Sequence, residues 1–208
     1  MQDCRTQSEP SPLEDVATLP IIEDGLFDTL PGTPLPLIDF SGPHPVARGA
    51  LPLASLRDPL PEALTLMARI DEDGALLELC GISGLGRWRG ALATTGDDGI
   101  LTVFGCSQRD MAVAANAVIK AGGGLAVTEG DWINALIRLP GEGMSTDFDL
   151  AETAREIESL RNALDVIVDW KPPFLLKKLF ATPLSPTTES NQASRFGPDS
   201  DYPMVAAE

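Results

Sequence analysis

Basic and aromatic side chains meet in the run Arg87-Trp88-Arg89, within an otherwise acidic sequence. Guanidinium groups pair with carboxylates, and an indole can stack on a purine or anchor a protein contact. On an edge strand, the same charges would instead discourage unwanted strand pairing. The run is therefore a candidate contact for a ligand or a partner, with the edge-strand role as the alternative.

Asp97 and Asp98 form an adjacent pair of carboxylates between Gly96 and Gly99. Such a pair could hold a cation, but neighbouring residues of a tight turn point in different directions and Asp is a common turn residue. The sole histidine, His44, lies between two prolines with no acid or nucleophile in register. No catalytic residue is assigned from these groups.

Two glycine patterns suggest phosphate-binding loops at first sight. In the first, Gly84, Gly86 and Gly90 have the wrong last spacing, and a strand-like run follows them where a helix is needed. In the second, three glycines at 122–124 follow a helical segment instead of opening one. Both patterns favour turns over nucleotide binding.

The composition restricts the partners and the chemistry. The 208 residues carry a formal net charge of −16, which disfavours nucleic acid and anionic membranes. One histidine cannot build a multi-histidine metal site, and three scattered cysteines form no disulfide framework. We find no signal peptide and no apolar run long enough to span a bilayer, so we expect a cytoplasmic protein.

The prolines divide the chain. Of 18 prolines, only Pro140 lies between Pro61 and Pro172, so regular structure is favoured in the middle of the chain. We expect a proline-rich arm over 1–61 that packs in places on the core, a folded domain over 62–186, and a disordered tail over 187–208.

Patterns inside the domain predict alternating strands and helices. Apolar runs around turn residues predict two hairpins, 90–104 across Gly96–Gly99 and 125–137 across Glu129–Asp131, whereas 63–70 fits a strand or a short helix. Ser107 and Asp110 predict the start of a helix that ends at Gly122. A second helix is predicted over about 149–168, and a last short apolar element over 174–180. The expected buried stripe of the 149–168 helix is Leu150, Ile157, Leu160, Leu164 and Ile167.

This order of elements predicts an α/β (α+β) fold. We expect a two-layer sandwich of mixed or antiparallel strands with two main helices.

The order of several motifs resembles the C-terminal domain of bacterial adenine deaminases, which belong to the amidohydrolase superfamily. The similar stretches are Gly86–Thr95, Val103–Ala112, Ile119–Val127, Leu139–Asp147 and Pro172–Leu175. They lie within about 63–186, over half of the chain. The resemblance implies that 63–70 is a strand.

The resemblance implies that a preceding amidohydrolase barrel supplies the His and Asp ligands of a divalent metal in members of that family. Here about 60 residues precede the domain, where a barrel needs roughly 250. The family's short histidine-containing run is replaced by Gly96–Gly99. We therefore expect no cofactor and no metal-dependent deamination by this chain alone.

Three functional hypotheses stay open. In the first, the chain is an accessory or interaction subunit that binds a purine-deaminase-type amidohydrolase barrel or self-associates. In the second, it binds a purine-like ligand. In the third, it is one part of an adenine deaminase completed in trans. An exposed apolar patch would favour a partner. A pocket would favour a ligand. The candidate contacts for a ligand or a partner are Arg87, Trp88, Arg89, Asp97, Asp98, Ser145 and Asp147.

Overall fold

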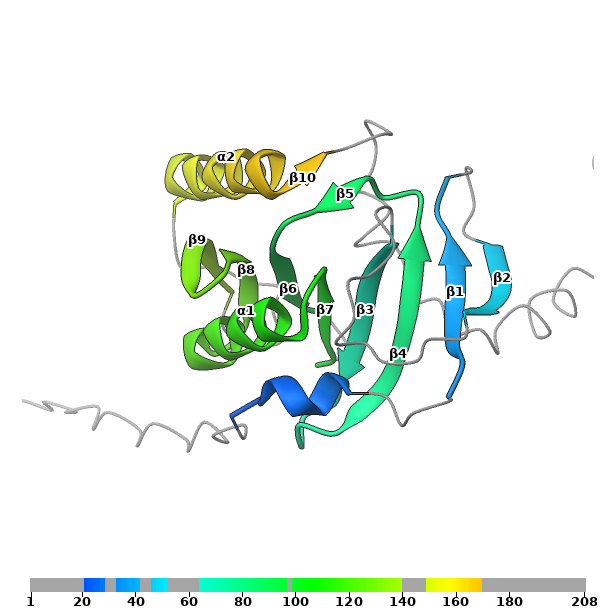
Figure 1. The fold of residues 1–208 in the computed structure, drawn as a ribbon. Helices are drawn as coiled ribbons and strands as arrows, with labels where there is room; N and C mark the ends of the chain where they lie inside the picture. Colours follow the sequence, from blue (N-terminus) through cyan, green and yellow to red (C-terminus); the bar gives the residue numbers. More distant parts are fainter. Residues whose placement is uncertain are drawn as a thin grey trace, which may run out of the picture.

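A computed structural model describes residues 21–28, 33–41, 46–51, 64–96, 99–139 and 149–169. The elements run in the order η1 (Asp24–Phe27), β1 (Leu35–Asp39), β2 (Val46–Leu51), β3 (Leu64–Ile70), β4 (Leu76–Ser83), β5 (Arg87–Trp88), β6 (Ala91–Thr95), β7 (Leu101–Gly105), α1 (Gln108–Ala121), β8 (Gly124–Glu129), β9 (Trp132–Arg138), α2 (Leu150–Ile167) and β10 (Val168–Asp169). Figure 1 shows their arrangement.

Eight of the strands form one sheet in the order β2-β1-β4-β3-β7-β6-β8-β9, and β10 pairs with β5 in a separate two-stranded ladder. Only the β1–β4 pair is parallel, and the other neighbours are antiparallel. The β6–β7 and β8–β9 hairpins and the strand assignment of 63–70 are confirmed. Strand β4 carries no alternating pattern, and the sequence analysis missed it.

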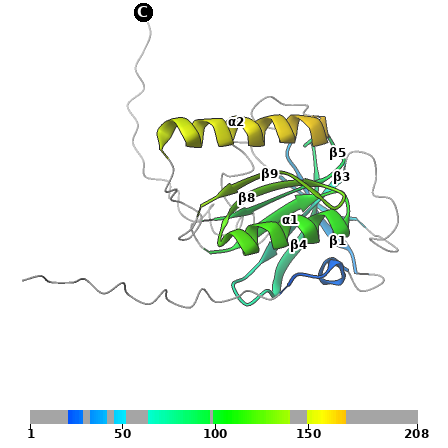
Figure 2. The same cartoon turned by 90° about the vertical axis from the view of Figure 1, so that its left-hand side faces the viewer.

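Each face of the large sheet packs against its own helix. Alternate residues along β6 show this, since Ala91 and Ala93 belong to the apolar cluster that contains α1, whereas Leu92 belongs to the cluster that contains α2. Figure 2 shows α2 on one side of β8 and β9 and α1 on the other. The α/β class with two main helices is confirmed. In place of the two layers we expected, the sheet lies between the helices because its central strands are apolar on both faces.

Helix α1 begins and ends where its sequence predicts. The Ser107 hydroxyl accepts a hydrogen bond from the Asp110 backbone N–H, and Gly122 ends the helix with a left-handed φ of 75°. Two residues later, Gly124 opens β8 at φ 125°, where a Cβ atom would lie 1.9 Å from the Ile137 carbonyl oxygen. The glycine run therefore ends the helix and lets β9 approach closely.

Helix α2 is capped by Asp149, whose side chain accepts from the Glu152 N–H. The predicted stripe is correct for Leu160, Leu164 and Ile167, which are buried. It is wrong for Leu150 and Ile157, which are 87% and 54% exposed. Both residues lie at heptad spacing before the buried Leu164, so the first half of the helix leaves exposed a face that the second half buries.

Part of the proline-rich arm lies in the core. Phe27 of η1 and Leu35 of β1 are buried against the α1 side of the sheet, and Ile38 is buried on the α2 side. The 1–61, 62–186 and 187–208 boundaries stay predictions, and 174–180 lies outside the described residues. In the described part of the chain, no helix is both long and apolar enough to cross a membrane.

Candidate functional site

The run Arg87-Trp88-Arg89 lies beside the C-terminal end of α2. Arg87 and Trp88 form β5, which pairs antiparallel with β10, so that Trp88 lies opposite Val168. Trp88 is only 5% exposed, and its ring centroid lies 6.3 Å from that of Phe104. The indole therefore packs in the core on the α2 side of the sheet.

Arg89 is engaged with α2. Its backbone N–H donates to the Ile167 carbonyl oxygen at 2.8 Å, and its guanidinium donates to the carbonyl oxygen of Val166. The last carbonyls of a helix lack partners within the helix, and a cation there also suits the helix dipole. Arg89 thus caps α2 from a distant part of the chain.

The structure brings together only part of the predicted contact set. Arg87, Trp88 and Arg89 are adjacent, with Arg87 exposed and opposite Asp169 in the ladder. The other four candidates, Asp97, Asp98, Ser145 and Asp147, lie outside the described residues, as do His44 and Cys4. Contact of the seven residues with a ligand or a partner stays a prediction.

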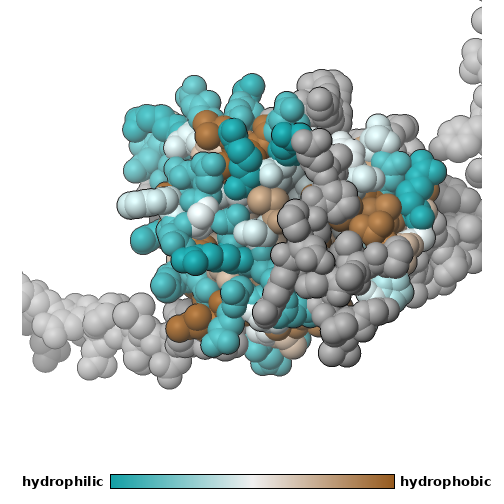
Figure 3. Space-filling view, viewed as in Figure 1, coloured by the Kyte–Doolittle hydropathy of each residue, from teal (hydrophilic) through white to brown (hydrophobic). Residues whose placement is uncertain are grey.

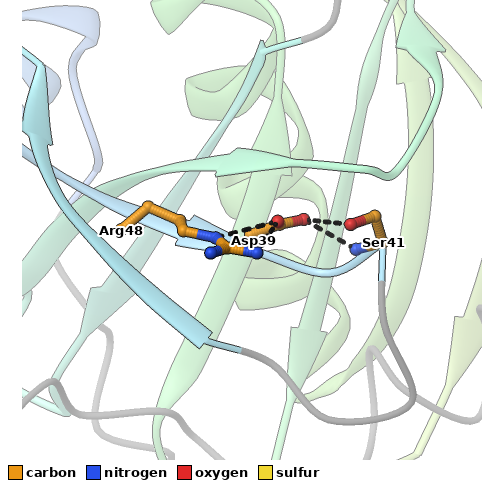
Figure 4. Close-up of polar contacts among 3 residues, drawn as sticks. All are labelled: Asp39, Ser41 and Arg48. Atoms are coloured by element: carbon orange, nitrogen blue, oxygen red, sulfur yellow. Dashed lines mark hydrogen bonds and ion pairs between the residues drawn. The ribbon is translucent and has the colours of Figure 1, made fainter.

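A polar network that the sequence did not predict lies at the end of β1. The Asp39 carboxylate accepts from the Ser41 backbone N–H at 2.8 Å and hydroxyl at 2.6 Å, and Arg48 of β2 pairs with its other oxygen at 3.0 Å (Figure 4). The Ser41 hydroxyl, then the Ser41 N–H and Arg48, lower the pKa of Asp39 despite some desolvation. The network ties β2 to β1.

Gly84 belongs to the first glycine pattern, and it permits a close approach to this network. It adopts a φ of 86°, and a Cβ atom there would lie 2.4 Å from the Ser41 backbone nitrogen. The glycine therefore serves a turn, as the spacing indicated. An Asp-x-Ser run is common in loops, which is why the sequence alone did not single the network out.

A second missed pair joins β3 and β4. Arg69 and Glu78 lie opposite each other with a 3.9 Å ion-pair distance, and their side chains are 11% and 14% exposed. Burial raises the pKa of Glu78, and Arg69 offsets part of that shift. The signal for this pair is its cross-strand register, which depends on the unpredicted strand β4.

The described cysteines are not activated. Burial raises the pKa of Cys80 to about 12, and burial together with Asp110 raises the pKa of Cys106 to about 11. A thiol with such a pKa stays protonated near neutrality and is a poor nucleophile. Cys80 and Cys106 are free thiols, as the sequence analysis expected.

Apolar side chains reach the surface at separate places. Trp132 and Ile133 at the start of the edge strand β9 are 78% and 50% exposed, and Leu150 and Ile157 project from α2. Figure 3 shows such apolar spots within a mostly hydrophilic surface, including over α2. Exposed aromatic and aliphatic side chains next to each other are typical of contact surfaces.

The described residues hold no group of three or more His, Cys, Asp or Glu side chains suited to a metal ion. The expectation of no cofactor stays a prediction.

Comparison with known families identifies the middle of the chain. A sequence model described as "Adenine deaminase C-terminal domain" matches residues 57–192, more than half of the chain. The match contains the elements from β3 to β10 and leaves η1, β1 and β2 outside.

Several curated proteins that this chain resembles are named adenine deaminases. Over 117 residues the chain is 49% identical to "Adenine deaminase 2" of Rhizobium etli and 47% identical to that of Rhizobium meliloti, covering 55% of this chain. The "Adenine deaminase" of Serratia proteamaculans is 40% identical over 103 residues. The matched part spans only 20% of the length of the two Rhizobium proteins, so in them it is one part of a larger protein.

Proposed function

Because the chain belongs to the adenine deaminase C-terminal domain family, we propose that it is an accessory or interaction domain of a purine-deaminase-type amidohydrolase. In this proposal it does not deaminate adenine by itself. It acts by binding the barrel of such an enzyme. We also propose that it works in the cytoplasm.

The observation that carries the proposal is the extent of the match. Adenine deaminases of two Rhizobium species contain a segment 47–49% identical to this chain, and that segment is a fifth of each protein. A domain retained at this identity within a larger enzyme has surfaces adapted to the rest of that enzyme. We infer that the present domain keeps such a surface.

The packing of Trp88 favours the accessory role over purine binding at the Arg87-Trp88-Arg89 run. A purine stacks on an exposed aromatic face, whereas Trp88 is 5% exposed. Arg89 is held by the end of α2. These two side chains serve the packing of the domain itself.

The proposed contact includes the start of β9. Trp132 and Ile133 are adjacent, large and at least half exposed, and Trp is the residue type most enriched among binding hot spots. An amidohydrolase surface that packs on Trp132 would bury its side chain, whereas Ile133 points to the opposite face of the strand.

The test begins with the tagged full-length chain purified from its native cells, with mass spectrometry of the proteins that accompany it. We expect an amidohydrolase barrel protein at near-equal amounts. Recovery of the chain alone, or with unrelated proteins only, would overturn the proposal. So would release of ammonia from adenine by the purified chain without a partner.

Two variants locate the contact. Trp132→Ser should reduce recovery of the barrel protein at least about tenfold if the side chain is a hot spot. Leu77→Ser is the matched control, because Leu77 is also an exposed apolar strand residue, at 53%. Adenine turnover by the complex that stops when this chain is removed would assign the role of a subunit completing the enzyme in trans.

A further inference from the structure

The segment Ile21–Asp28 lies on α1 in the manner of a bound peptide. The Ile22 backbone N–H donates to the Asn116 side-chain oxygen at 2.9 Å, and the Asn116 side-chain nitrogen donates to the Ile22 carbonyl oxygen at 2.8 Å. One amide side chain thus pairs with both backbone groups of a single residue, as a neighbouring strand would. This pairing recognises extended backbone whatever the side chain.

Two apolar anchors flank the turn of the segment. Ile22 is 4% exposed and Phe27 is fully buried, whereas Ile21 is 77% exposed. Both anchors join the cluster around α1, whose buried residues include Ala112, Ala114, Ala115 and Ala117. Small side chains on a helix leave room for a second element to approach, so the alanines make space for a large anchor.

A third contact fixes the far end of the segment. Gln108, at the first turn of α1, donates to the Asp28 carboxylate at 2.8 Å. Between the anchors, the segment satisfies part of its own backbone through Leu26 N–H to Glu23 and Asp28 N–H to Gly25. The hydrogen bonds of the turn therefore lie within the segment itself and do not depend on α1.

The segment and its binding surface belong to different parts of the chain. Residues 21–28 lie outside the family match over 57–192, whereas α1, with Gln108 and Asn116, lies inside it. The family domain thus supplies the surface, and a segment external to it supplies the occupant.

We propose that the α1 face of this domain is a peptide-docking site, and that residues 21–28 are its own releasable occupant. The site takes a short peptide with two apolar anchors five residues apart, the second aromatic and followed by a carboxylate that accepts from Gln108. Asn116 reads the backbone at the first anchor, and the buried position of Phe27 selects the second. The inference does not depend on the function proposed above.

The test cuts the full chain after it has folded. A protease recognition sequence inserted between Pro31 and Gly32 allows the segment to be severed from the rest. A fluorescent peptide of residues 19–31 is then added, and fluorescence anisotropy follows its uptake. We expect the cut protein to exchange its own fragment for the labelled peptide with a Kd in the micromolar range, and the uncut protein to take up none.

Matched controls separate specific docking from adhesion. A labelled peptide with Phe27→Ala should bind at least about tenfold more weakly, because it lacks the buried anchor. The cut chain with Asn116→Ala should also lose affinity, whereas Asn162→Ala, on the exposed side of α2, should not. Equal binding of both peptides would overturn the proposal.

Two further outcomes would overturn it. One is unfolding or precipitation of the cut protein, which would make the segment an inseparable part of the core. The other comes from native-state hydrogen exchange on the unmodified chain, which needs no insertion. We expect the Ile22 amide to open in a local event well before the amides of α1, and simultaneous opening would contradict a releasable occupant.

Discussion

At the scale of single residues, Arg89 shows how a candidate contact becomes part of the scaffold. Its charge and its neighbour Trp88 suggested recognition of a ligand or partner. In the structure its guanidinium and backbone N–H both serve the last carbonyls of α2. The Val168 N–H donates to the Leu164 carbonyl oxygen, whereas the carbonyls of Val166 and Ile167 take their donors from Arg89 because the chain continues as β10.

Arg89→Ala should therefore loosen the end of α2. We expect a loss of about 1 kcal/mol in the free energy of unfolding, with faster hydrogen exchange at the C-terminal turn of α2. Arg109→Ala removes the same charge from an exposed ion pair on α1 and is the control. Similar exchange in both variants would show that the cap contributes nothing.

The buried thiols permit a second test at this scale. Because the pKa of Cys80 is raised to about 12 and that of Cys106 to about 11 from a reference of 9.0, little thiolate exists near pH 8. We expect alkylation by iodoacetamide, mapped by mass spectrometry, to be on the order of 100- to 1,000-fold slower than for a free cysteine. Denaturant should abolish the protection. Rapid labelling of the folded protein would contradict the burial.

Asp39 permits a test of pH dependence. A carboxyl whose pKa is lowered by folding contributes stability above its ordinary pKa, and that contribution is lost as the pH falls through the folded value. Asp39→Asn should thus cost below about 1 kcal/mol at neutral pH, since the pair is near the surface. In urea unfolding, the difference between the two proteins should begin to shrink as the pH falls below the ordinary value of 3.8, and it should vanish only below the lowered pKa of the folded state. A difference that persists at low pH would mean that charge is not its source.

At the scale of elements, α2 shows the limit of periodicity. Apolar residues at heptad spacing run the length of the helix, yet the buried ones, Leu160, Leu164 and Ile167, all lie in its second half. That half is held by Arg89 and by the β5–β10 ladder. Leu150 and Ile157 precede Leu164 at heptad spacing but are exposed, so the first half of the helix is less covered than the second.

Two leucines of α2 test this division. Leu164→Ala should cost about 2–5 kcal/mol, because Leu164 is fully buried. Leu150→Ala should change stability by less than about 0.5 kcal/mol, because Leu150 is 87% exposed. Chemical denaturation of both variants measures the two values. Equal losses in the free energy of unfolding would show that Leu150 is buried as the sequence predicted.

Both outer strands of the large sheet are interrupted by bulges. In β2 the register shifts opposite Leu37, next to Gly49 with a φ of 95°, and in β9 it shifts near Asn134. Bulges and edge charges such as Arg48 disfavour addition of another strand. The described edges therefore favour contacts through side chains, which agrees with the proposed role of Trp132.

At the scale of the whole molecule, the acidic balance dominates. A formal net charge of −16 over 208 residues creates repulsion within the folded chain and a negative potential around it. This repulsion opposes the compact state and discourages association with acidic partners. A partner surface should carry basic groups around an apolar centre.

Salt should accordingly stabilise the protein. Between ~10 mM and ~300 mM NaCl, we expect the melting temperature to rise by a few degrees, because the Debye length falls from about 30 Å to below 10 Å. Differential scanning fluorimetry measures the shift, and KCl should reproduce it. An unchanged or falling melting temperature would show that the repulsion is locally compensated.

Local signals were sufficient for a large part of the fold. Helix α1 begins after Ser107 and ends at Gly122, as predicted, because caps act on the adjacent backbone. The two hairpins followed from short turns, whose residue types determine their geometry. These features need only contacts between residues close in the chain, so the sequence predicts them directly.

The family, too, could be recognised from sequence, because the order of short motifs survives in the printed residues and the 57–192 match agrees with it. The exposure of the predicted contact residues could not be recognised in this way. Trp88 lies in the core, and no pattern of neighbours could reveal that Phe104 and α2 would cover it. Exposure depends on which elements pack over a residue.

The sequence by itself thus determined the elements that are closed by their own caps and turns, and the family to which they belong. Tertiary structure alone decided that β1 joins β4, that the helices take opposite faces of the sheet, and that Asn116 holds Ile22 across 94 positions. The reason is physical. Each of these contacts gains its free energy from surfaces that meet only after the chain has folded.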